Sequence, residues 1–146
     1  MSNLLKKEKG FTLIEIVLVL AIAGLLLVIV FLAVSGAQKS RRDSQRKNDA
    51  SGYAAAVEQY ASNHAGVYPA TGVAPGATYF ARNDPQTGLP YAPSGAVAAA
   101  PPIGTIAYAT GNICAGPLCV AAGAKPNNYA VVIGTEQGGS YCVDNH

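Results

Sequence analysis

The sequence predicts an α+β protein in which one long N-terminal helix packs on a small antiparallel β-sheet head. Three observations support this fold class. The chain has 146 residues, enough for one small domain with a short appendage. Residues 16–34 are 19 consecutive residues without a charged or strongly polar side chain, and helical periodicity continues beyond them. Strand-like runs occur only in the last third of the chain.

The composition argues against several classes of function. Half of the residues are hydrophobic, 12% are charged, and the net charge is +2, so a dedicated nucleic-acid binder is not expected. Histidine occurs only at positions 64 and 146, which argues against a catalytic metal site built on histidines. Neither a Ser-His-Asp pattern nor a phosphate-binding loop is present. We therefore expect no enzyme activity, no cofactor and no metal.

The apolar run predicts a membrane helix. At a rise of about 1.5 Å per residue, 19 to 24 apolar residues cover the roughly 30 Å hydrocarbon core of a bilayer. A cleaved signal peptide is the alternative, because Ala33-Val34-Ser35 before Gly36 has small residues at the right places. Signal-peptide apolar regions are about 7–15 residues long, however, and this run is longer. A single transmembrane segment over residues 11–36 is the better interpretation.

Glu15 is unusual at the start of this run. An ionised carboxylate in a membrane segment costs on the order of 2–3 kcal/mol, less near the edge. If the chain were cut between Gly10 and Phe11, the new α-amino group would lie four residues before Glu15, about one helical turn away. The carboxylate could then pair with that ammonium group, in its own chain or in a neighbour. The alternative is an interfacial glutamate that reaches the lipid headgroups.

The residues around this point carry a family resemblance. The string Lys9-Gly10-Phe11-Thr12-Leu13-Ile14-Glu15 directly follows a short basic leader. Over about residues 1–62 the sequence resembles the type IV prepilins, a family of type IV pilins, type II secretion pseudopilins and competence pilins. The resemblance implies that residues 1–10 are a leader, that prepilin peptidase cuts between Gly10 and Phe11, and that Phe11 becomes N-methylated. It also implies that Glu15 pairs with the Phe11 amine during assembly.

The resemblance implies a structural role. The expected function is that of a pilin in a type IV pilus-like filament, the class that serves cell adhesion and twitching motility. The alternative is a pseudopilin of type II secretion or a competence pilin for DNA uptake. Major pseudopilins commonly carry a calcium site with several acidic residues in the C-terminal loops, where this chain offers only Glu136 and Asp144. Expected partners are copies of the chain, other pilins, prepilin peptidase, the inner-membrane assembly platform and, before assembly, membrane lipid. The chain would begin as a single-pass inner-membrane protein and end in an extracellular filament.

One position departs from the family pattern. Many pilins have glycine where Gly24 stands and proline eight residues later, a pair that permits local melting of the helix. Here Leu32 takes the place of the proline. We expect some flexibility at Gly24 but a more continuous helix.

The second half of the helix, about residues 37–65, is expected to be amphipathic. Tyr53, Val57, Tyr60 and His64 recur at helical spacing. The basic cluster at residues 39–47 is interpreted as a solvated or headgroup-level stretch. It outnumbers the basic residues of the leader, so the positive-inside tendency by itself favours the opposite orientation of the helix. We give the leader motif more weight.

The head is expected to span residues 66–146. A helix-to-sheet loop over 66–104 holds seven of the nine prolines and is interpreted as filament surface with no chemistry. Strands are predicted around residues 105–110 and 129–133, the latter with Tyr129, Val131 and Ile133 on one face. A turn at Gly138-Gly139 is predicted to complete a hairpin with residues 140–143.

Three cysteines, Cys114, Cys119 and Cys142, lie in this head. An odd number leaves one of them unpaired in an oxidising compartment. A Cys114–Cys119 bond across the turn between them is slightly favoured. The alternative joins Cys142 to one of the other two and closes a longer loop.

Overall fold

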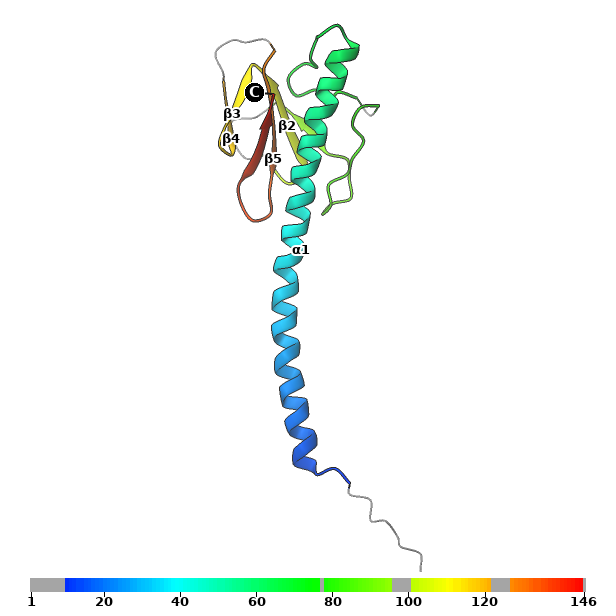
Figure 1. Cartoon of the computed structure of the whole chain (residues 1–146), viewed down its shortest axis with the longest axis vertical. Coiled ribbons are helices and arrows are strands. Elements are labelled where there is room, and N and C mark those ends of the chain that lie inside the picture. Colours follow the sequence, from blue (N-terminus) through cyan, green and yellow to red (C-terminus); the bar gives the residue numbers. More distant parts are fainter. Residues whose placement is uncertain (1–9, 77, 96–100, 122–126, 146) are drawn as a thin grey trace, which may run out of the picture. The chain divides into compact units, whose positions relative to one another are not determined.

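The computed structural model describes residues 10–145 except for residues 77, 96–100 and 122–126. The predicted leader, residues 1–10, therefore lies outside the described residues except for Gly10. The elements are α1 (Leu13–Asn63), β1 (Ala92–Ser94), β2 (Thr105–Thr110), β3 (Asn112–Ala115), β4 (Leu118–Ala121), β5 (Tyr129–Gly134) and β6 (Ser140–Asp144), as Figure 1 shows. The chain divides into two compact units, one up to Ala37 and one from Gln38 onward.

The first unit contains the apolar part of α1. By length and composition this helix can cross a membrane, and none of its most apolar 18-residue window is buried. Helix geometry is uninterrupted at Gly24 and at Leu32. Because proline is absent at position 32, every backbone N–H there remains able to donate within the helix.

The second unit contains a four-stranded sheet in the order β1-β2-β5-β6. β2, β5 and β6 are antiparallel, and the hairpin predicted at Gly138-Gly139 is confirmed by the pairing of Gly134 with Ser140. Both turn glycines have positive φ, which favours glycine there. The short β1 is parallel to β2, so the sheet is mixed.

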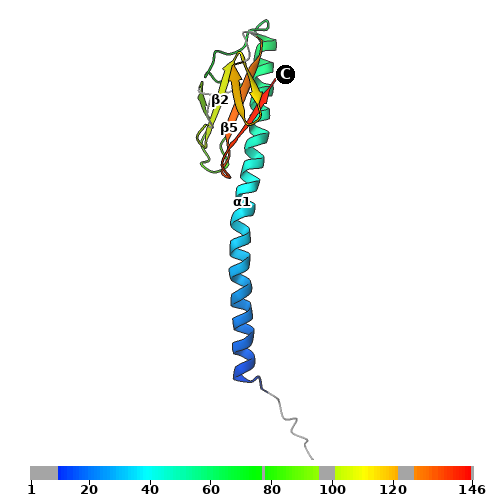
Figure 2. The ribbon, with the colours of Figure 1, turned by 90° about the vertical axis from the view of Figure 1, so that its left-hand side faces the viewer.

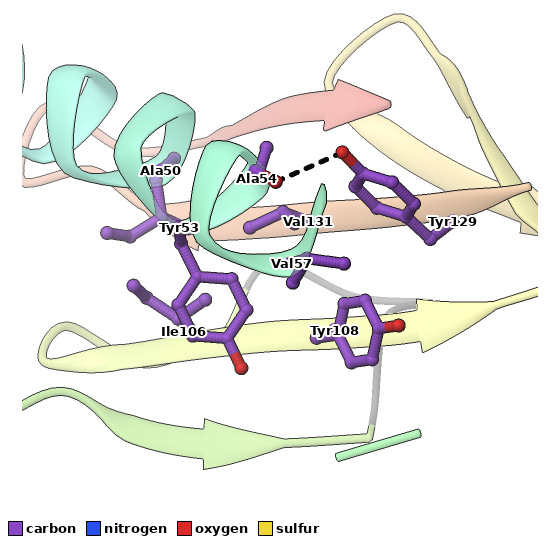
Figure 3. Close-up of a cluster of buried hydrophobic side chains, with 9 residues drawn as sticks. Ala50, Tyr53, Ala54, Val57, Ile106, Tyr108, Tyr129 and Val131 are labelled. Atoms are coloured by element: carbon purple, nitrogen blue, oxygen red, sulfur yellow. Dashed lines mark hydrogen bonds between the residues drawn. The ribbon is translucent and has the colours of Figure 1, made fainter. Parts of the chain in front are cut away.

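One face of this sheet packs against the second half of α1. The strands contribute every second residue to this contact, and the helix contributes residues at helical spacing. Figure 3 shows Tyr53 and Val57 of the helix meeting Tyr108 and Val131 of the strands. Tyr129 donates from its hydroxyl to the carbonyl oxygen of Ala54 at 3.2 Å. Ile106, Tyr108, Tyr129, Val131 and Ile133 all point to this face, as their alternation predicts.

Figure 2 shows β2 and β5 side by side in the four-stranded sheet. The face of this sheet away from α1 is covered by a second, two-stranded sheet of β3 and β4 (Figure 1). The small apolar layer between them contains Ala107, Ala109, Cys119, Ala130 and Val132. β5 is therefore buried along its whole length. A strand buried on both faces is expected to be a continuous apolar run, and Tyr129–Gly134 is one.

Candidate functional site

The N-terminal segment places the predicted processing residues at the start of α1. Gly10 and Phe11 precede the helix, and the Phe11 side chain is 81% exposed. The backbone N–H groups of Glu15 and Ile16 donate to the Thr12 carbonyl at 3.1 and 3.4 Å. Thr12 and Glu15 therefore stand at the N-cap and third helical positions, the spacing of a capping box. Sequence reasoning did not recognise this spacing, although Thr-x-x-Glu before an apolar run is its usual signal.

Glu15 is exposed and lies in the first turn of the helix. The partial positive charge of a helix N-terminus favours a carboxylate there. Within the described residues, the carboxylate has neither a hydrogen-bond nor an ion-pair partner. The part of the chain that the structure describes thus presents this charge without a partner.

The helix surface after Glu15 is apolar and uncovered. Its large side chains from Ile16 to Val34 are between 46% and 74% exposed. Contiguous exposed apolar area of this kind marks a surface that another partner covers, either lipid or protein. Gly24 lies within it, and a Cβ atom built on Gly24 would meet nothing within 4 Å.

A buried ionic cluster ties the second half of α1 to the head. Arg46 is completely buried and donates from Nε to Asp84 at 2.7 Å. Its other nitrogens donate to Asp43, Glu136 and Gln86. One guanidinium group therefore joins α1, the loop over residues 66–104 and the β5–β6 turn.

Arg42 and Asp43 complete this cluster. Arg42 forms a two-pronged contact with Glu136 at 2.6 and 2.7 Å, the geometry in which guanidinium and carboxylate match best. Asp43 accepts from the backbone N–H groups of Glu136 and Gln137 at 2.8 and 3.3 Å. Asp84 likewise accepts from the N–H groups of Gln86 and Thr87, both at 2.9 Å.

These contacts correct two expectations. The basic cluster over residues 39–47 is not solvated as a whole, because Arg46 is buried and Arg42 is paired. The loop over residues 66–104 is not only surface, because Asp84 is 1% exposed and anchors it. The positive flank is thus partly neutralised in the folded head. Sequence reasoning missed the cluster because Arg46 and Asp84 are 38 residues apart with no periodic relation.

The cluster predicts acid sensitivity. Burial would raise the pKa of Asp84, but its bonds from Arg46, Thr87 and Gln86 outweigh this and lower the pKa. The hydrogen bond from Arg42 lowers the pKa of Glu136. A carboxyl whose pKa is lower in the folded state stabilises the head at pH values above its unfolded-state pKa of about 4. This stabilisation is lost as the pH falls through the folded-state pKa. We therefore expect the melting temperature of the head to decrease when the pH is lowered below about 4. Thermal unfolding followed by near-ultraviolet circular dichroism measures this change. The Glu136→Gln variant should have a lower melting temperature than the wild type at pH 7, but its melting temperature should decrease less on acidification. An equal loss in both proteins would contradict it.

The cysteines meet on the sheet face away from α1. The structure joins Cys114 of β3 to Cys142 of β6, whereas sequence reasoning slightly favoured Cys114–Cys119. Cys114 and Cys119 do face each other in the β3–β4 register, as the turn between them suggested. Packing of this hairpin on the sheet also brings β6 within reach, which the sequence spacing does not show. Cys119 has no disulfide and is buried.

Comparison with known proteins now bears on the N-terminal segment. Residues 5–31 match the family model described as the prokaryotic N-terminal methylation motif. Comparisons with curated proteins and with solved structures give no match. The matched segment includes Gly10, Phe11, Glu15 and the apolar run up to residue 31.

The fold and the matched segment together define the class. The chain combines a long apolar N-terminal helix with a small α+β head, and it carries the class III leader of a type IV prepilin-like protein. The match supports a precursor of the type IV pilin or pseudopilin type. Such a motif implies processing by prepilin peptidase and assembly with other subunits of the class, and the apolar helix fits membrane anchoring of the precursor.

Proposed function

We propose that the chain is a pilin, a structural subunit of a type IV pilus-like filament. Prepilin peptidase cuts between Gly10 and Phe11, the new Phe11 amine is methylated, and mature chains polymerise through their N-terminal helices. The observation that carries this proposal is the Glu15 carboxylate. It is exposed, has no partner among the described residues, and precedes 19 apolar residues.

Assembly follows from this unpaired charge. In apolar surroundings an isolated carboxylate or ammonium is expensive, so each favours the position where it meets the other. Glu15 of an incoming chain would therefore select the register in which it lies beside the Phe11 amine of a neighbour. The exposed side chains from Ile16 to Val34 then pack into the filament core. Gly24, which has the weakest helix propensity in this segment, is where the helix would bend during packing.

Two carboxylates favour a pilus over a secretion machine. Calcium-binding pseudopilins would need free acidic groups in the C-terminal loops. Glu136 is engaged by Arg42 and Arg46, and Asp144 accepts from the Cys114 N–H at 2.6 Å. Both carboxylates are thus already engaged within the folded head. A pseudopilin or a competence pilin remains the second candidate, on the shared N-terminal motif.

The proposal also implies where the chain is located before and after assembly. It begins as a single-pass protein of the inner membrane, passes to the pilus assembly platform, and ends in an extracellular filament. Its partners in the filament are further copies of itself and other pilins.

The test is the N-terminal sequence and intact mass of the mature protein from native membranes and from the sheared surface fraction. We expect a chain that begins at Phe11 and is about 14 Da heavier than its sequence, from one methyl group. Its presence in sheared filaments supports a pilin, whereas a mature chain found only in the membrane supports the secretion or competence alternative. A chain that begins at Met1 or at Gly36 would contradict the assembly proposal.

A further inference from the structure

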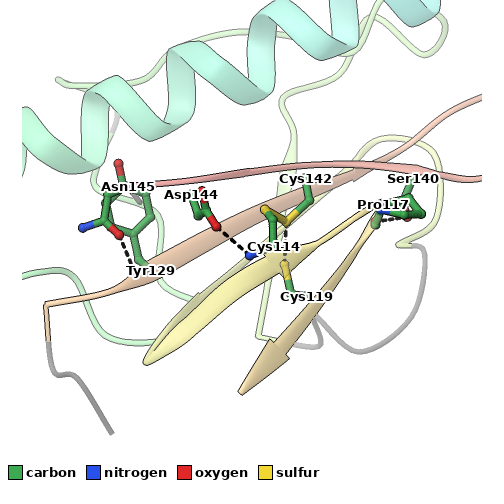
Figure 4. The surroundings of a disulfide bond; sticks show 8 residues. All are labelled: Cys114, Pro117, Cys119, Tyr129, Ser140, Cys142, Asp144 and Asn145. Atoms are coloured by element: carbon green, nitrogen blue, oxygen red, sulfur yellow. Dashed lines mark hydrogen bonds between the residues drawn. A yellow bond between two sulfur atoms is a disulfide. The ribbon is translucent and has the colours of Figure 1, made fainter. Parts of the chain in front are cut away.

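The three cysteine sulfurs form one group, although only two are bonded. Cys114 lies on β3, Cys119 directly opposite it on β4, and Cys142 on β6 (Figure 4). Their Sγ atoms all lie within 4.8 Å of one another. The Cys119 thiol lies 2.8 Å from Sγ of Cys142, whose bond to Cys114 is intact. The free thiol thus contacts one end of the disulfide.

The surroundings hold this arrangement in place. Asp144 accepts from the N–H of Cys114 and so fixes β3 beside β6. Ser140 donates to the carbonyl oxygen of Pro117, in the turn between β3 and β4, which fixes the other end of the hairpin on β6. Both contacts are independent of which cysteine carries the bond. The hairpin is therefore kept at bonding distance from Cys142.

We propose that these three residues form a thiol–disulfide exchange centre, in which Cys142 bonds alternately to Cys114 and to Cys119. The Cys119 thiol loses its proton to solvent, and the resulting thiolate attacks Sγ of Cys142. A Cys119–Cys142 bond forms as the Cys114–Cys142 bond breaks, and Cys114 leaves as a thiolate that takes up a proton. One bond forms and one breaks, so neither an oxidant nor a reductant is consumed.

The exchange changes what the head presents. In the observed form the free thiol is Cys119, which is 6% exposed. In the other form the free thiol is Cys114, which is half-buried and thus more accessible. The centre would unmask a thiol able to react with small electrophiles or low-molecular-weight disulfides. Cys142 is common to both bonds, so β6 stays covalently attached to the hairpin throughout.

The environment makes the exchange slow at neutral pH. Burial, and then the nearby Asp144 carboxylate, raise the pKa of the Cys119 thiol to about 11. The residues of β2 and β5 in the same layer are Ala107, Ala109, Ala130 and Val132, none of them charged. Below that pKa the attacking thiolate increases about tenfold per pH unit, so the exchange should be about a thousandfold faster at pH 9 than at pH 6.

The first test follows the free thiol in the full-length protein in detergent micelles. Samples held at pH 6 and pH 9 are quenched in acid, denatured, labelled with a maleimide at about pH 5 and mapped after pepsin digestion. We expect label on Cys119 and also on Cys114, with the Cys114 label appearing far sooner at pH 9. Label confined to Cys119 after a day at pH 9 would overturn the proposal, as would an equal rate at both pH values.

Serine variants provide the second test. Cys114→Ser is expected to form a Cys119–Cys142 bond and to contain no free thiol after denaturation, while Cys119→Ser keeps the Cys114–Cys142 bond. Cys142→Ser is the matched control, because no bond to β6 can form in it. Two free thiols in oxidised, folded Cys114→Ser, judged by its near-ultraviolet circular dichroism, would overturn the proposal. If that variant does not fold, the wild-type labelling result alone decides.

Discussion

Replacing Arg46 by methionine is expected to destabilise the head by about 3–5 kcal/mol, because it leaves a buried carboxylate without its cation. Small domains are stable by only about 5–15 kcal/mol, so most of the margin would be lost. The carboxylate most affected is Asp84, which is 1% exposed and bonded to Arg46 through two nitrogens. Glu136 retains Arg42, and Asp43 retains two backbone N–H groups. The loss should therefore concentrate on the loop that Asp84 anchors.

The measurement is thermal unfolding of the full chain in micelles, followed by near-ultraviolet circular dichroism. All eight tyrosines lie at or after Tyr53, so this signal is dominated by the head and not by the apolar half of α1. Arg41→Met is the matched control, because Arg41 is an exposed arginine of the same helix. A second variant, Arg46→Met with Asp84→Asn, removes both charges and should recover at least about 1 kcal/mol. If Arg46→Met and Arg41→Met have the same melting temperature, the cluster does not stabilise the head.

Replacing Glu15 by alanine is expected to leave cleavage intact and to prevent entry into the filament. The cut lies between Gly10 and Phe11, four residues before Glu15, and needs no carboxylate there. An unpaired ammonium in apolar surroundings costs about 2–3 kcal/mol, a factor of roughly 30 to 150 per subunit contact. Glu15→Gln keeps the size and removes the charge, so it should fail in the same way.

The amount of mature chain in sheared filaments measures this effect, and N-terminal sequencing of the membrane fraction measures cleavage. Glu58→Ala is the control, because Glu58 is an exposed acid of the same helix in its head-packing half. Wild-type amounts of Glu15→Ala in the filaments would rule out the charge-pairing role. A variant that accumulates with its leader attached would place Glu15 in recognition by the peptidase instead.

The first half of the chain could be interpreted from the sequence because its signals are local. An apolar run of membrane length, a glycine before phenylalanine and a glutamate five residues after that glycine all act within a few helical turns. The same holds for the β5–β6 hairpin, where Gly138-Gly139 separates two alternating runs. The family match over residues 5–31 agrees with the leader, and the strand register agrees with the predicted hairpin.

The tertiary structure decided what depends on contacts between distant residues. The basic stretch was expected to be solvated, yet Arg46 is buried and bonded to acids 38 and 90 residues away. The disulfide was not the slightly favoured pair, because packing of β3 on the sheet brings Cys142 to Cys114. Sequence alone indicated an apolar helix long enough to cross a membrane, the N-terminal methylation motif and the alternating strands, since periodicity and short motifs need no partner. Which charges are buried and which sulfurs meet was decided only by folding, because both depend on how the loop and hairpin pack against the sheet and helix.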